Sequence, residues 1–302
     1  MLEITVTPTS FASLNIDEVD AFVIGEAEFA LRLPYYFSHE ELIKAIELIK
    51  SKGKRVYVAI NKILHEYELK IVESYLKELK AYPVDGLIFG DLAVYRVASK
   101  LGLTNLLIYN PETYLTNYES ANFYYQKGIK RVSLAKEITL EDMLEIGKRA
   151  LLEVEVLGHG ALNMFHSKRD LVTNYFKFIK NEETHHNEPL YLVEEKRHEE
   201  KYPIIEDQNG THIFSGADLC TIEYLDQLIE AGLTSIRIDG YLKTDAELES
   251  IVKVYHKALR DFERDPQNYK NNKENYLNQL KSIDSIRQFN TGFLFKKTVY
   301  KG

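Results

Sequence analysis

The chain has 302 residues, of which 45% are hydrophobic and 28% charged, the composition of an ordinary globular protein. Its net charge of −8 argues against broad binding to nucleic acid, so we expect no DNA partner, although a local basic patch is compatible with this charge. No apolar run is long enough to span a bilayer and no signal peptide is recognisable, which predicts a cytoplasmic protein without a membrane partner. The single cysteine, Cys220, excludes an internal disulfide.

Strand-like and helix-like segments alternate along the first half of the chain. Apolar, β-branched runs predict strands at 3–8, 20–25, 55–60, 86–90, 105–110, 131–136 and 152–158. Helical spacing and capping residues predict helices at 38–53, 66–83, 92–102, 111–128 and 139–150. Ser38 and Glu41, for example, have the spacing of a capping box.

The alternation fails after Tyr175 and returns near residue 222. Residues 177–218 are polar and rich in turns, which predicts a mostly β insertion. A helix at 222–232, an eighth strand at 235–240 and a helix at 243–264 follow, and residues 265–302 form a C-terminal extension. Eight strand–helix units indicate a TIM-like (β/α)8 barrel over 1–264, with the insertion between strands seven and eight. A doubly wound open sheet is the alternative.

Charged and polar side chains follow the ends of most predicted strands, where barrel enzymes carry their sites. We expect Glu155, His159 and Glu137 to be catalytic. We expect a substrate to be bound by Glu26, Arg32, Asn61, Asp91, Lys136, Arg237 and Asp239. Structural readings are also open: Glu155 and Arg237 can form a buried ion pair, and His159 can be a turn histidine bonded to backbone. Lys136 and Glu137 can simply mark the entry to a helix.

Signatures of the common catalytic and metal sites are missing. HEEL (39–42), HEYE (65–68) and HEEK (198–201) lack the second histidine of a zinc peptidase. His185, His186, His198 and His212 are close in sequence, but their spacing matches no defined metal site, so we predict no bound metal.

Several stretches together resemble one known family. They are GEAEFALR (25–32), RVYVAINKILHEYEL (55–69), VDGLIFGDLAVYRVA (84–98), KGIKRVSLAKEITLEDM (127–143), EVEVLGHGALNMF (153–165), SIRIDGY (235–241) and NTGFLF (290–295). In combination they resemble the collagenase-like peptidases of family U32 and span nearly the whole chain. The resemblance implies a barrel-like catalytic domain. It also implies one of several activities, since the family includes collagenases, proteins that hydroxylate tRNA or ribosomal RNA, and proteins of quinone hydroxylation.

Many members of that family carry four cysteines that hold an iron–sulfur cluster. At the first two of those positions this chain has Asn163 and Asp170, and Cys220 stands alone. One thiolate cannot hold such a cluster, so we expect none and assign no certain cofactor. The final arginine of the family's late motif is also replaced, by Tyr241.

A short, cysteine-poor chain is similar to the smaller of two paralogues in Gram-positive bacteria. The resemblance implies a subunit or accessory role in forming 5-hydroxyuridine at the tRNA wobble position, with tRNA and a longer, cluster-bearing paralogue as partners. One alternative is an endopeptidase in which Glu155 and His159 activate a water molecule. A second alternative is a non-catalytic barrel scaffold.

Overall fold

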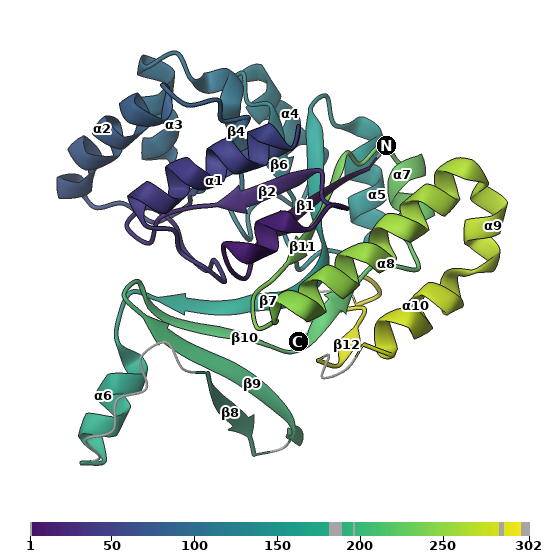
Figure 1. The fold of residues 1–302 in the computed structure, drawn as a ribbon. Helices are drawn as coiled ribbons and strands as arrows, with labels where there is room; N and C mark the ends of the chain where they lie inside the picture. The colour runs from purple at the N-terminus through teal and green to yellow at the C-terminus, as the bar shows by residue number, and fades with distance from the viewer. Residues whose placement is uncertain (1, 181–188, 196, 284–286, 297–302) are drawn as a thin grey trace.

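The computed structural model describes residues 2–180, 189–195, 197–283 and 287–296. Eight parallel strands form a closed barrel (Figure 1). In order around the barrel they are β1 (Glu3–Thr7), β2 (Ala21–Ile24), β3 (Arg55–Ile60), β4 (Gly86–Phe89), β5 (Leu107–Tyr109), β6 (Arg131–Ser133), β7 (Glu153–Ser167) and β11 (Ser235–Asp239). The ring closes because β11 pairs in parallel with both β1 and β7. The predicted barrel is confirmed, and the open-sheet alternative is wrong.

Side chains alternate between two environments along the barrel strands. On β1, Ile4 and Val6 are buried in the apolar layer between the strands and the surrounding helices. Glu3 and Thr5 lie on the opposite side, in the barrel interior, where they bond to each other and Thr5 contacts Ser235 of β11. The barrel therefore has an apolar outer core, and its interior is polar beside β1, β6, β7 and β11 and largely apolar beside β2 to β5.

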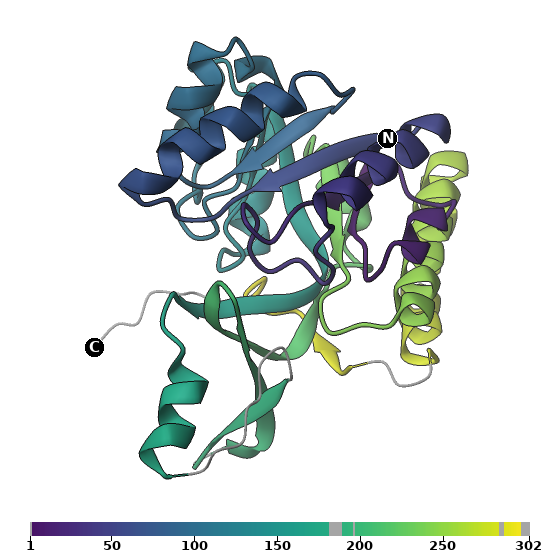
Figure 2. The same cartoon turned by 60° about the vertical axis from the view of Figure 1, so that its left-hand side comes forward.

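Helices cover the outside of the barrel (Figures 1 and 2). They are α1 (His39–Ser51), α2 (Leu69–Leu79), α3 (Leu92–Lys100), α4 (Tyr118–Gln126), α5 (Leu140–Arg149), α7 (Leu225–Glu230) and α8 (Asp245–Arg264). The capping box of Ser38 and Glu41 is confirmed at the start of α1. Short 3₁₀ helices occupy Ala12–Asn15, Glu66–Glu68 and Thr104–Leu106, and the first of these is the only helix of the β1–β2 connection, all of which the structure describes.

An arm projects from the barrel, as both ribbon views show. It consists of the outer part of β7 with α6 (Leu171–Phe178), β8 (Leu190–Glu194), β9 (Arg197–Asp207) and β10 (Gly210–Cys220). β10 pairs antiparallel with β7 on one side and with β9 on the other, and β8 adds to β9. The expected β insertion is present, but it begins within β7 and includes the unexpected helix α6.

Several expected element boundaries differ from the structure, and three of the differences affect the course of the chain. The seventh strand continues past Gly158, where a β-bulge replaces the expected end. The helix expected from 111 begins at Tyr118, because Asn117 caps it and residues before it form a loop. The helix expected over 66–83 is shorter, since its first turn is a 3₁₀ helix and α2 ends at Leu79.

The C-terminal extension packs on the barrel. α9 (Pro266–Asn271) and α10 (Lys273–Lys281) contact α8, and β12 (Phe289–Asn290) adds in parallel to β10. The amide of Leu140 donates to the carbonyl of Leu294, which ties this segment to α5. Over the described part of the chain, no helix has both the length and the apolar character needed to cross a membrane.

Candidate functional site

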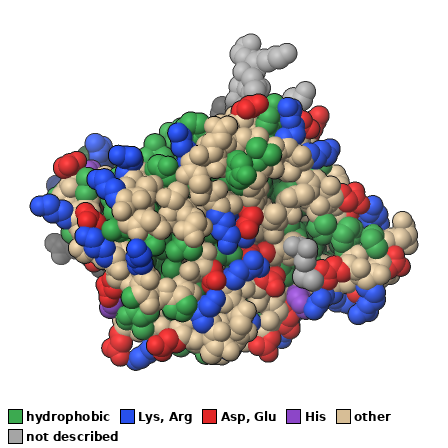
Figure 3. Space-filling view, turned by 90° about the horizontal axis from the view of Figure 1, so that it is seen from above, with side chains coloured by type: hydrophobic (Ala, Val, Ile, Leu, Met, Phe, Trp, Pro, Cys, Tyr) green, Lys and Arg blue, Asp and Glu red, His purple; other side chains and the backbone are tan. Residues whose placement is uncertain are grey.

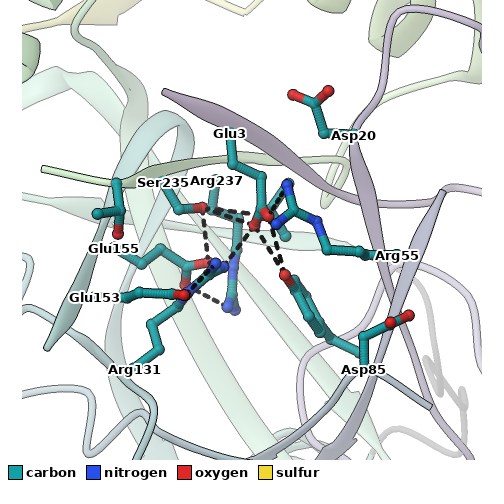
Figure 4. A network of polar contacts seen from close by, with 12 residues as sticks. Glu3, Asp20, Arg55, Asp85, Arg131, Glu153, Glu155, Ser235 and Arg237 are labelled. Atoms are coloured by element: carbon teal, nitrogen blue, oxygen red, sulfur yellow. Dashed lines mark hydrogen bonds and ion pairs between the residues drawn. The ribbon is translucent and has the colours of Figure 1, made fainter. Parts of the chain in front are cut away.

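A network of charged side chains fills the interior of the barrel at its N-terminal end (Figure 4). Arg131 of β6 is almost completely buried, and its guanidinium lies 2.5 Å from Glu3 and 2.6 Å from Glu153. Tyr57 donates to Glu3 at 3.0 Å, and Arg55 forms an ion pair with the same carboxylate. Burial raises the pKa of Glu3, but the bond and the charge of Arg131 outweigh it, so the pKa of Glu3 is lowered.

One step toward the C-terminal end, the network continues through Glu155 and Arg237, which point toward each other from β7 and β11. Glu155 is 2% exposed. It accepts a hydrogen bond from the Ser133 hydroxyl at 2.7 Å and forms an ion pair with Arg237. The Arg237 Nε atom is buried and has no partner among the described residues. Glu155 and Arg237 therefore form the buried ion pair that the sequence left open as an alternative.

Above this pair, a cavity of about 50 Å³ opens at the C-terminal mouth of the barrel. Of the ten residues predicted for the site, six line it, namely Arg32, Asn61, Lys136, Glu155, Arg237 and Asp239. Two wider grooves, of about 930 and 600 Å³, flank it on either side of the mouth. Lys136 and Asn163 line the cavity and both grooves, so these two residues mark the centre of the mouth.

A second charged cluster forms one rim of the cavity around Glu112, a residue that follows the fifth predicted strand but is not among the ten predicted site residues. Glu112 lies 2.9 Å from Arg32 and 3.1 Å from Lys136. Burial alone would raise the pKa of Glu112, but Lys136 and Arg32 hold it far below its ordinary value. Both Arg32 and Glu112 have a positive φ, which few non-glycine residues adopt. The sequence could have identified Glu112 as a site residue, because it follows the end of the fifth strand in the same way as the other predicted residues follow theirs.

His159 lies on the other side of the β7 strand from Glu155. Leu157 pairs with Arg237 and His159 with Ile238, so Gly158 is an extra residue that reverses the alternation. His159 is consequently 0% exposed against the edges of the Tyr255 and Phe289 rings. Burial, together with Lys243, lowers its pKa to about 3, so the ring is neutral. His159 and Glu155 therefore do not meet in one cavity.

The remaining predicted residues lie around the mouth in different settings. Glu26 contacts His39 of α1 at 3.1 Å and does not line the cavity. Asp91 caps α3 by accepting from the Ala93 amide and also accepts from the Leu64 amide. Glu137 is exposed between the two grooves. Within the cavity wall, Asn61 accepts from the Leu31 amide and Asp239 accepts from Thr7.

The residues present do not fit the family's iron–sulfur cluster. Asn163 stands at the mouth, where its amide oxygen is buried without a partner among the described residues. Asp170 lies exposed at the start of α6, and the chain's single thiol, Cys220, is buried beside the Tyr255 hydroxyl. Burial raises the pKa of that thiol to about 11. A cluster of this kind needs thiolate ligands, so no step can be assigned to it here.

Comparison with known proteins places the chain in a family. The model of peptidase family U32 matches residues 9–301. The chain is 38% identical to tRNA hydroxylation protein P2 of Bacillus subtilis over 99% of both chains. It is 26% identical to tRNA hydroxylation protein P1 of the same organism, over 86% of this chain and 63% of that one. An uncharacterised protease of Methanocaldococcus jannaschii is 30% identical over 92% of this chain and 68% of its own length. This chain belongs to peptidase family U32.

Proposed function

We propose that this protein acts in tRNA hydroxylation as a P2-type subunit that contributes to 5-hydroxyuridine formation at the wobble position and holds no iron–sulfur cluster of its own. The observation that carries the proposal is the end-to-end similarity to a tRNA hydroxylation protein, with 38% identity over 99% of each chain. Similarity over the whole length supports a shared role more strongly than a shared barrel would, because one barrel fold hosts many activities.

The geometry of the mouth supports a role in binding. The central cavity, at about 50 Å³, has room for a few water molecules but not for a nucleotide. The flanking grooves are large enough for nucleotides, and Lys136 stands between them. Basic and acidic side chains are mixed over the face seen in Figure 3, with no broad field of one sign. That face, on the side of the N-terminus, therefore provides no surface for wide electrostatic binding.

The partner would be a longer paralogue that carries the cluster. B. subtilis has both a P1 and a P2 protein, and this chain is similar to both. It matches only 63% of the length of P1, so P1 has sequence for which this chain has no counterpart. We propose that a P1-type protein supplies the chemistry that a chain with one buried cysteine cannot.

The geometry gives less support to an endopeptidase. Both oxygens of Glu155 have partners, namely Ser133 and Arg237 on one and Ser235, at 3.4 Å, on the other. A carboxylate held in this way is poorly placed to take a proton from water. His159, the other member of the suggested pair, lies outside the cavity.

Deleting the gene in its host and measuring wobble 5-hydroxyuridine in tRNA digests by mass spectrometry tests the proposal. We expect the modification to disappear. The wild-type gene should restore it. The control variant Arg260→Met, a change on the exposed side of α8, should restore it equally well. Arg237→Met, present at the same protein level, should restore it less completely. An unchanged level in the deletion strain would refute the proposal. Cleavage of gelatin by the purified protein that Glu155→Gln abolishes would favour the endopeptidase.

A further inference from the structure

The groove of about 600 Å³ has an unusual lining for a solvent-exposed surface. Its walls include Ile63, Leu92, Tyr114 and Phe165, with exposed fractions of 54%, 54%, 80% and 44%. Large apolar side chains gathered in one concavity commonly mark a binding site, particularly where polar groups converge beside them. The polar groups here come from both parts of the molecule, with Arg32 and Lys136 on the barrel and His166 on the arm.

His166 is the end of a chain of polar side chains that runs back into the arm. Its Nδ1 atom lies 3.1 Å from Nδ1 of His212, and the two rings are nearly parallel. The Nε2 atom of His212 lies 3.3 Å from the Asp207 carboxylate, which also accepts from the Asn209 amide and the Tyr36 hydroxyl. His212 is 0% and Asp207 5% exposed, so only His166 of the three reaches the groove.

For a neutral His212, these contacts assign which nitrogen of each ring carries the proton. A carboxylate accepts, so His212 donates from Nε2 to Asp207, and its Nδ1 then holds a lone pair. His166 must donate from Nδ1 to that lone pair, which leaves its own Nε2 as an acceptor. Burial, with the neighbouring His212 and Arg32, lowers the pKa of His166 to about 4, consistent with a neutral ring. The Nε2 atom has no partner among the described residues.

We propose that this groove binds an unstacked uracil base, and that Nε2 of His166 accepts the base's N3–H. This inference rests on the proposed function and names the site at which the RNA substrate is read. Proteins recognise single-stranded RNA by stacking bases on aromatic side chains and bonding their Watson–Crick edges. Tyr114, which is 80% exposed, provides a ring, and His166 provides the acceptor.

The same groove also contains donors that could serve the two carbonyl oxygens of the uracil edge. On that edge a single N–H stands between two carbonyl oxygens, so a complementary site needs one acceptor flanked by donors. Arg32 and Lys136 line the same groove as His166, and each has donors only. Cytosine presents a lone pair at N3, which would face the lone pair of His166. The site should therefore select uracil over cytosine.

Binding of anticodon stem-loop hairpins to the full chain tests this inference. Three hairpins would carry uridine, N3-methyluridine or cytidine at the wobble position and be otherwise identical. We expect the uridine hairpin to bind at least about tenfold more tightly than the other two, because a site built around one hydrogen bond rejects analogues that lack it. His166→Phe, which keeps an aromatic ring, should remove this preference. His256→Phe on the outer helix α8 should keep it.

The outcomes separate this inference from the proposed function. Equal binding of all three hairpins by the wild-type protein would overturn the inference and leave the tRNA role standing. No binding of any hairpin, either alone or with the P1-type paralogue present, would contradict both. Long-range proton–nitrogen NMR of the free protein gives an independent readout. A proton on Nδ1 of His166 and none on Nε2 is the expected result, and the opposite assignment would overturn the inference.

Discussion

The barrel and the outer elements of the arm differ in how fully they bury their side chains. The barrel hides even its charges, since Arg131 and Glu155 are 1% and 2% exposed. The arm leaves apolar groups in solvent, including Phe178 of α6 at 83% and Tyr191 of β8 at 56%. A closed ring of strands has two protected faces, whereas an antiparallel extension has free faces and a free edge. The difference suggests that the barrel provides the stability, while the arm provides surface for contacts.

Among the variants that test this contrast, Arg131→Met should have the largest effect. The change leaves Glu3, which is 4% exposed, without its main partner inside the barrel. Removing one member of a buried ion pair costs about 3–5 kcal/mol. We expect a loss of that size in the free energy of unfolding, measured by chemical denaturation. Arg260→Met, at an exposed pair on α8, should change it by less than about 0.5 kcal/mol. Equal effects would mean that the interior charges are not what holds the barrel.

Phe214→Ala should loosen the arm and spare the barrel. Phe214 is 2% exposed and stacks on Tyr241 with ring centroids 4.5 Å apart, which joins β10 to the barrel side. Truncating a buried phenylalanine costs about 3 kcal/mol. Hydrogen exchange should become faster in β9 and β10, and exchange in β1 to β5 should stay the same. Faster exchange throughout would show that the two regions unfold as one unit.

His159 tests the junction, because it pairs with both Ile238 of the barrel and Cys220 of the arm. Its pKa of about 3 lies below the ordinary value of a histidine, so the unfolded chain binds a proton more readily than the folded one. Stability contributed by the neutral ring is therefore complete above about pH 6.5 and falls as the pH drops toward 3. At pH 5 the loss should be about 2 kcal/mol.

His159→Gln should remove this part of the acid sensitivity. Denaturation curves at pH 7 and pH 5 would measure it, and the difference between the two pH values should be about 2 kcal/mol smaller in the variant. His65→Gln, at an exposed position, is the matched control. If the two variants and the wild type lose stability in parallel, the neutral buried histidine is not responsible.

The smallest effect is expected at the outer edge of the arm. Tyr191→Ser on β8 removes a ring that is 56% exposed, so the free energy of unfolding should change by less than about 0.5 kcal/mol. Thermal denaturation at two protein concentrations would measure it. A larger loss that grows with concentration would reveal that copies of the chain cover this edge.

The eight barrel strands could be predicted from sequence because each is a short apolar run that local patterning identifies. The course of β7 could not. Gly158-His159-Gly160 resembles a turn, yet Gly160 lies where β7 passes so close to β11 that a Cβ atom would come within 2.7 Å of Asp239. Only the strand pairing reveals that a glycine is needed where the two strands come this close, and that the His159 side chain points away from the barrel interior.

Six of the ten predicted site residues line the cavity, because the strand ends of a barrel converge by geometry. The His166–His212 contact could not be predicted in the same way. The two residues are 46 positions apart and meet only through the antiparallel register of β7 and β10. No local pattern encodes that register, since it depends on how the arm folds back.

The continuity of β7 also limits how the molecule can move. The arm is not joined to the barrel by a flexible linker, because the same strand of 15 residues runs from one into the other. β10 crosses the same junction, where Asp218 to Cys220 pair with β7, so a swinging arm would have to bend two paired strands. The arm therefore keeps one orientation relative to the mouth of the barrel, and in the proposed tRNA role it would present a fixed surface beside that mouth.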